Sequence, residues 1–220
     1  MKQEFNPSEN ERFLNLYRQL EQLQSSSPET ARYLKQRFYD EIETYRKLRN
    51  YLSHEEYRGN YPFCVSSRMC DDMERILNLS RAKAIDIASK DIAYAEVGHS
   101  LRRAQDAFLK HGYSYLPILD EKRRVLGTVT PLSLLQFEGQ LDKKIGDLLP
   151  SFALDQHPKR LIFVARNEFA HAVTAALTRV KDGKRVGLAF VTENGKPTES
   201  ILGVITLLDG ICFLQTDRGE

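Results

Sequence analysis

The sequence predicts a two-domain α+β protein, in which a small α-helical domain precedes a pair of α/β repeats. Residues 1–80 contain one glycine and long stretches of helix-forming residues. From about residue 85, short β-rich segments alternate with amphipathic helical ones. One such segment occurs twice, which indicates two copies of one supersecondary unit packed together. The predicted boundaries are 1–80 for the helical domain, 85–140 for the first repeat and 145–215 for the second.

The composition is typical of a folded globular protein, with 41% hydrophobic and 28% charged residues. No apolar run approaches the ~20 residues that a membrane-spanning helix needs. The opening "MKQEFNPSENER" has neither an apolar core nor a small-residue cleavage site, so no secretory signal is expected. We therefore expect a cytoplasmic protein that does not enter a membrane.

The cysteines and the charge distribution argue against two further classes of site. Cys64, Cys70 and Cys212 are odd in number and widely spaced, which is untypical of a disulfide framework or a thiolate zinc site. We predict no metal site. Residues 1–80 hold 12 basic and 13 acidic residues, and residues 81–220 hold 20 and 17. Neither part is basic enough to predict nucleic-acid binding from charge alone, and we expect no DNA partner.

The helical domain is predicted to contain two long helices and a shorter one. The second helix starts at Pro28, after Ser27 as a candidate N-cap, and extends beyond Leu52. A shorter helical stretch surrounds "CDDMERILNL". The first helix carries an apolar stripe at helical spacing, formed by Phe13, Leu16, Tyr17, Leu20 and Leu23.

One arginine of the second helix interrupts its apolar stripe. At 100° per residue, Arg49 falls between the directions of Tyr45 and Ile42, whereas His54 would lie almost opposite. A buried guanidinium is costly without a partner. Arg49 therefore predicts an ion pair, a cluster at an interface, or a cavity open to an anion.

The segment "RNYLSH" resembles the Arg-polar-x-x-x-His motif of the HEPN superfamily, and the sequences of the predicted helices around it resemble that superfamily too. The resemblance implies a homodimer in which the motifs of two chains meet in one cleft. It also implies a metal-independent endoribonuclease that leaves a 2′,3′-cyclic phosphate. His54 would then act as acid or base on the 2′-hydroxyl of RNA, Arg49 would stabilise the phosphorane charge, and Asn50 would position one of them.

In a second hypothesis, the helical domain has no catalytic activity. In an inactive HEPN-like dimer, Arg49 would pair with a carboxylate such as Asp40 or Glu43, and His54 would only end a helix. The domain would then dimerise or hold a protein partner. The third alternative is a chance resemblance.

The two repeats end in similar phrases, "GTVTPLS" at 127–133 and "GVITLLD" at 203–209. A glycine permits close approach of a ligand to the backbone, a threonine hydroxyl stands at a helix N-terminus, and a carboxylate three residues later can meet a ribose diol. Thr206 and Asp209 satisfy this pattern. Thr130 matches in the first repeat, but Ser133 replaces the carboxylate. The same residues could alternatively serve only as helix caps.

These phrases, together with "YSYLPILD" at 113–120, resemble the CBS domain, and the pair resembles the tandem module that binds adenine nucleotides between its halves. The resemblance implies that Thr206 holds phosphate and Asp209 holds the ribose hydroxyls. It places the strand with Ile162, Phe163 and Val164 beside the adenine. Ribose recognition at Ser133 should be weaker.

The resulting hypothesis is a regulatory protein that senses an adenine nucleotide and thereby controls a dimeric HEPN-like ribonuclease. The ligand would be AMP, ADP, ATP or cyclic di-AMP, since all four present adenine, ribose and phosphate. The alternative is a non-catalytic nucleotide-binding scaffold.

Overall fold

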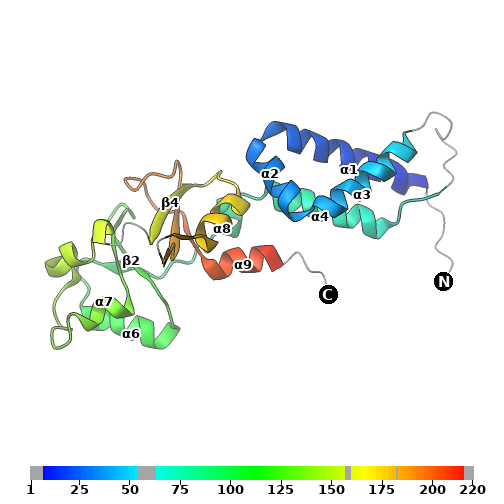
Figure 1. The fold of residues 1–220 in the computed structure, drawn as a ribbon. Coiled ribbons are helices and arrows are strands. Elements are labelled where there is room, and N and C mark those ends of the chain that lie inside the picture. Colours follow the sequence, from blue (N-terminus) through cyan, green and yellow to red (C-terminus); the bar gives the residue numbers. More distant parts are fainter. Residues whose placement is uncertain (1–6, 54–62, 157–159, 182, 216–220) are drawn as a thin grey trace. The chain divides into compact units, whose positions relative to one another are not determined.

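The chain forms two compact units, which we describe one at a time in a computed structural model (Figure 1). Unit 1 is Met1–Ala82 and unit 2 is Lys83–Glu220. Unit 1 is helical wherever the structure describes regular elements, whereas unit 2 combines helices with short strands. The described residues are 7–53, 63–156, 160–181 and 183–215.

Serine caps set the beginning of two helices in unit 1. The Ser27 hydroxyl accepts the backbone N–H of Thr30 at 3.3 Å, and the Ser66 hydroxyl accepts that of Met69 at 3.3 Å. Helix α1 contacts all three of the other helices described in this unit. The helices are α1 (Pro7–Ser26), α2 (Pro28–Arg37), α3 (Tyr39–Leu52) and α4 (Ser67–Arg81).

The continuous helix predicted from Pro28 to beyond Leu52 is wrong, because the chain leaves helical geometry at Phe38 (φ −129°, ψ 31°). The Phe38 ring is 3% exposed and packs edge-on against Tyr33, with centroids 5.8 Å apart. The one-residue break separates α2 from α3, and each packs against α1. Burial of Phe38 thus outweighs the helix propensity of the segment.

The apolar stripe predicted on the first helix is confirmed and forms the centre of unit 1. Phe13, Leu16, Tyr17 and Leu20 are buried, while Leu23 is half-buried. Facing residues come from the other three helices, and they include Leu34, Tyr45, Leu52, Met73, Ile76 and Leu77.

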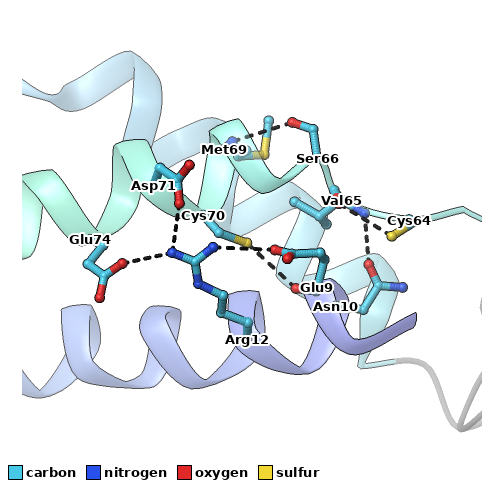
Figure 2. A network of polar contacts seen from close by, with 10 residues as sticks. All are labelled: Glu9, Asn10, Arg12, Cys64, Val65, Ser66, Met69, Cys70, Asp71 and Glu74. Atoms are coloured by element: carbon cyan, nitrogen blue, oxygen red, sulfur yellow. Dashed lines mark hydrogen bonds and ion pairs between the residues drawn. The ribbon is translucent and has the colours of Figure 1, made fainter. Parts of the chain in front are cut away.

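A buried asparagine fixes the segment before α4 (Figure 2). Asn10 is 0% exposed; its Oδ1 accepts the backbone N–H of Val65 at 2.8 Å, and its Nδ2 donates to the carbonyl of Phe63 at 2.9 Å. The side chain therefore satisfies two backbone groups at once, one of them in a buried environment.

An exposed ionic cluster joins α1 to α4 nearby (Figure 2). The Arg12 guanidinium lies 2.7 Å from Asp71, 2.8 Å from Glu74 and 3.5 Å from Glu9. The hydrogen bonds that Arg12 donates to Asp71 and Glu74 raise the pKa of Arg12 above its usual value, so it stays charged. Because the cluster is solvated, it orients the two helices more than it stabilises them.

Unit 2 repeats one order of elements twice, as the sequence predicts. In each repeat, a parallel strand pair is followed by an antiparallel one, giving the three-stranded sheets β1-β2-β3 and β4-β7-β8. The first repeat is β1 (Ala95–Glu96), α6 (Leu101–His111), β2 (Leu116–Leu119), β3 (Val125–Val129) and α7 (Pro131–Leu135). The second is β4 (Leu161–Ala165), α8 (Ala170–Thr178), β7 (Leu188–Thr192), β8 (Gly203–Thr206) and α9 (Leu207–Gln215).

The segment before each repeat packs along the last strand of the other repeat. After α5 (Ala84–Ile87), Ser89 exchanges two backbone hydrogen bonds with Val204 of β8, at 2.9 and 3.0 Å. After η2 (Ile145–Ser151), the Phe152 carbonyl accepts the N–H of Thr128 in β3 at 2.9 Å. A short helix η3 (Leu154–Gln156) follows. The crossed segments bind the repeats to each other and bring residues from both to one place.

Candidate functional site

A cavity of about 690 Å³ lies between the two repeats of unit 2. This volume falls within the roughly 300–1,000 Å³ common for small-molecule sites. The crossed segments explain its position, because the chain before β1 pairs with β8 through Ser89 and Val204. The walls include residues 91–93 and 112–115 of the first repeat and 185–188 and 206–209 of the second.

Thr206 and Asp209 line this cavity and are held rigidly by each other. The Thr206 backbone N–H and its Oγ1 both donate to Asp209 Oδ2 at 2.7 Å. In return, the Asp209 N–H donates to Thr206 Oγ1 at 3.4 Å. Within the described part of the chain, Asp209 Oδ1 accepts no hydrogen bond. The carboxylate therefore caps α9 with one oxygen and keeps the other for a ligand.

Thr130 and Ser133 form the matching cap at α7. The Ser133 hydroxyl accepts the Thr130 N–H at 2.8 Å and donates to the Thr130 carbonyl at 2.8 Å, and the Ser133 N–H donates to Thr130 Oγ1 at 3.1 Å. Ser133 is 6% exposed and has no second oxygen. Neither residue is among the described ones that line the cavity. The structure thus does not bring this pair together with Thr206 and Asp209.

The strand expected beside the adenine is not among the described residues that line this cavity. Ile162, Phe163 and Val164 belong to β4, which pairs with β7 at the edge of the second sheet, and they are half-buried. The corresponding wall belongs to the first repeat, through Ile92 and Ala93. Their position depends on how the repeats cross, which no local pattern in the sequence indicates.

Two tyrosines that are not among the predicted site residues also line the cavity. Tyr113 is 38% exposed, and Tyr115 packs against the apolar cluster that contains Leu188. Tyr115 requires a glycine opposite it, since a Cβ on Gly187 would lie 2.8 Å from Tyr115 Cε2 and nearer still to the hydroxyl. The "YSY" before a predicted strand was the available signal for an aromatic wall.

Only part of the HEPN-like motif of unit 1 lies within the described residues. Arg49 is half-exposed rather than buried, and its Nη2 lies 3.3 Å from Glu21 Oε1. Its guanidinium carbon is 5.5 Å from the Tyr17 ring centroid, and its Nη1 donates to Asn50 Oδ1 at 3.2 Å. His54 lies outside the described residues.

The partner of Arg49 differs from those expected. Neither Asp40 nor Glu43 takes this role in the described region; Glu21 of α1 does, while Glu43 binds Arg46 at 2.6 Å. A carboxylate 28 positions away in the sequence is reached because α1 and α3 pack together. Of the three environments predicted for Arg49, the structure supports the ion pair.

The described residues contain no group of three or more His, Cys, Asp or Glu side chains that could hold a metal ion. Cys64, Cys70 and Cys212 are free thiols. Among the helices of the described ranges, none is long and apolar enough to cross a bilayer.

Comparison with known proteins finds a family match for the first repeat. Residues 84–138 match the family model of the CBS domain. The carnitine transport ATP-binding protein OpuCA of Listeria monocytogenes is 38% identical over 66 residues, which are 29% of this chain and 17% of that protein. This chain thus matches less than a fifth of the curated relative's length.

Solved CBS structures are similar at lower identity. The CBS domain pair of protein MJ0100, in complex with 5′-methylthioadenosine and S-adenosyl-L-methionine, is 18% identical with a TM-score of 0.46, covering 62% of this chain and 98% of that one. The CBS domain of a bacterial CNNM/CorC family Mg²⁺ transporter, in complex with ATP, is 22% identical with a TM-score of 0.48, covering 66% and 94%. The CBS family model matches the first repeat, and the second repeat has the same order of elements.

Proposed function

We propose that the protein is a regulatory protein that binds an adenine nucleotide in the cavity of unit 2. The observation that carries the proposal is the Thr206–Asp209 cap, which lines the cavity and leaves one carboxylate oxygen unused. Asp209 Oδ1 accepts the ribose hydroxyls, because an ionised carboxylate is acceptor-only and suits a diol. The amides at the start of α9 favour the phosphate.

The opposite wall suits the base. Ile92 and Ala93 offer apolar contact, and Tyr113, which is 38% exposed, adds an aromatic side chain to the wall. A flat base that is apolar on its faces and polar at its edge fits such a wall. AMP, ADP, ATP and cyclic di-AMP all carry the required adenine and ribose.

Calorimetric titration of the full chain with these four nucleotides tests the proposal. We expect saturable binding of at least one of them, and weaker binding by Thr206→Val, which removes the hydroxyl at nearly constant volume. Thr130→Val is the matched control, since Thr130 makes the equivalent cap outside this cavity. If none of the four binds, unit 2 is a structural platform and the proposal fails.

For unit 1 we propose a HEPN-like homodimer under the control of the nucleotide site, and two roles follow from the resemblance. As a metal-independent endoribonuclease, it would use Arg49, Asn50 and His54 on RNA. As a scaffold, it would hold a protein partner without catalysis. The ion pair of Arg49 with Glu21 and its contact with Tyr17 support the scaffold, because they already engage the guanidinium.

His54→Ala separates the two roles. A ribonuclease loses cleavage of a mixed-sequence RNA while it keeps its dimer mass and its nucleotide affinity; a scaffold shows no cleavage before or after the change. For an active ribonuclease, titrating the nucleotide into the assay then tests control, and an unchanged cleavage rate would rule control out.

A further inference from the structure

The second repeat contains an insertion that the first lacks. Four residues connect α6 to β2, whereas nine connect α8 to β7. The additional residues form a hairpin of β5 (Val180–Lys181) and β6 (Lys184–Arg185), which pair antiparallel. Gly183 takes φ +68° at the turn, a conformation that glycine adopts without strain.

This hairpin is basic in sequence. Residues 179–185 read "RVKDGKR", with four basic residues and one acidic residue. The connection in the first repeat, residues 112–115, reads "GYSY" and has no charged residue. If Leu188 is matched to Leu116 at the start of the equivalent strands, Arg185 takes the place of Tyr113. The insertion therefore puts a cation where the first repeat has an aromatic ring.

Among the described residues of the hairpin, Arg185 lines the cavity, and it does so together with Thr206 and Asp209. Among the described lining residues, it is the only cationic side chain, and the acidic ones are Asp91 and Asp209. The Arg185 guanidinium makes no hydrogen bond or ion pair within the described ranges, unlike Arg166, which pairs with Glu193 at 3.3 Å. Its hydrogen-bonding capacity is therefore open to a ligand.

The charged residues of the cavity wall indicate where the phosphate of a ligand would bind. Two carboxylates repel an anion, so a phosphate is acceptable only where a cation and helix amides compensate. The cation is Arg185, and the amides belong to the start of α9, next to Thr206. Arginine binds phosphate oxygens through two parallel N–H groups, which makes it selective for that geometry.

We infer that Arg185 contacts the phosphate of the bound adenine compound, and that the β5–β6 hairpin makes the cavity selective for nucleotides over nucleosides. This inference rests on the proposed nucleotide site and identifies the residue that recognises the phosphate. Asp209 holds the ribose in either case. The hairpin decides whether a phosphorylated ligand is preferred.

Calorimetric titration of the full chain with adenosine and with AMP tests this assignment, because the two ligands differ only in the phosphate. A charge-assisted hydrogen bond contributes about 1.5–3 kcal/mol, so AMP should bind on the order of tenfold or more tightly than adenosine. In Arg185→Gln, the affinity for AMP should fall most of the way to the affinity for adenosine, because only the α9 amides still favour the phosphate. The affinity for adenosine should not change. The unchanged adenosine affinity also shows that the variant is folded.

Arg179→Gln is the matched control, since Arg179 begins the same insertion and is exposed outside the described cavity wall. It should keep the wild-type preference for AMP. The inference is overturned if Arg185→Gln also keeps that preference, or if the wild type binds both ligands equally; in both cases the nucleotide site itself stands. If neither ligand binds the wild type, the adenine site fails and the inference fails with it.

Discussion

Replacing Asp209 by serine should separate ligand binding from helix capping, because the first repeat shows how serine performs the cap. Ser133 accepts the N–H of Thr130 at 2.8 Å, and Asp209 accepts that of Thr206 at 2.7 Å; the return bonds are 3.1 and 3.4 Å. The cap should thus survive in Asp209→Ser. The remaining loss is the attraction between the carboxylate and the N-terminus of α9, about 0.3–1 kcal/mol.

The effect on the ligand should be much larger. Asp209→Ser removes the unused oxygen and the charge that bind the ribose, and one charge-assisted hydrogen bond is worth about 1.5–3 kcal/mol. Nucleotide affinity should therefore fall roughly 10- to 100-fold. For a protein of this size the melting temperature should fall by no more than about 2–4 °C. Asp209→Ala, which loses the cap as well, should melt lower.

Calorimetry with AMP and thermal unfolding of the same samples measure both quantities. Wild-type AMP affinity in Asp209→Ser would refute the ribose role and leave Asp209 as a helix cap only. A melting temperature as low as that of Asp209→Ala would refute the equivalence of the two caps.

Three further predictions concern packing and pH. Gly187→Ala should weaken AMP binding, because the added methyl group displaces the Tyr115 ring. In the double variant with Tyr115→Ala, much of the AMP affinity should return. If calorimetry shows that the two losses of affinity add up, the two residues do not interact in this way. Asn10→Ala should lower the free energy of unfolding of unit 1, measured by urea denaturation, by about 2–4 kcal/mol, because a buried N–H and a carbonyl lose their partner. No measurable decrease would show that water replaces the Asn10 side chain. Burial raises the pKa of Tyr45 and of Cys70 to about 12, so the folded state holds these protons at higher pH than the unfolded state does. This contribution to stability should be fully present below pH 9 and should decrease as the pH rises toward 12. If the melting temperature of Tyr45→Phe falls with pH as steeply as that of the wild type, Tyr45 is not a cause.

Local patterns predicted the fold well where the structure depends on neighbouring residues. The repeated order of elements in unit 2 follows from alternating short apolar runs, glycine turns and amphipathic helices, and the structure confirms it. The stripe around Phe13 follows from helical spacing alone. The break at Phe38 was not predictable in this way, because helix propensity continues across it and only tertiary burial of the ring favours the break.

The site was predictable on one side only. Thr206 and Asp209 stand three residues apart at a strand–helix junction, so their mutual contact is local. Ile92 and Tyr113 reach the same cavity through the crossing of two segments more than 90 residues apart in sequence. Arg49 illustrates the same limit, since its spacing indicated a need for a partner but not that Glu21 of another helix supplies it.

Hydrogen–deuterium exchange of the full chain with and without AMP tests the central claim most directly, because it locates the ligand as well as detecting it. Binding in the cavity predicts slower exchange in residues 89–93, 113–116 and 185–188 and at the start of α9, with no comparable change at the α7 cap. AMP binding with protection confined to other segments, or no protection anywhere at saturating AMP, would contradict a nucleotide site between the two repeats.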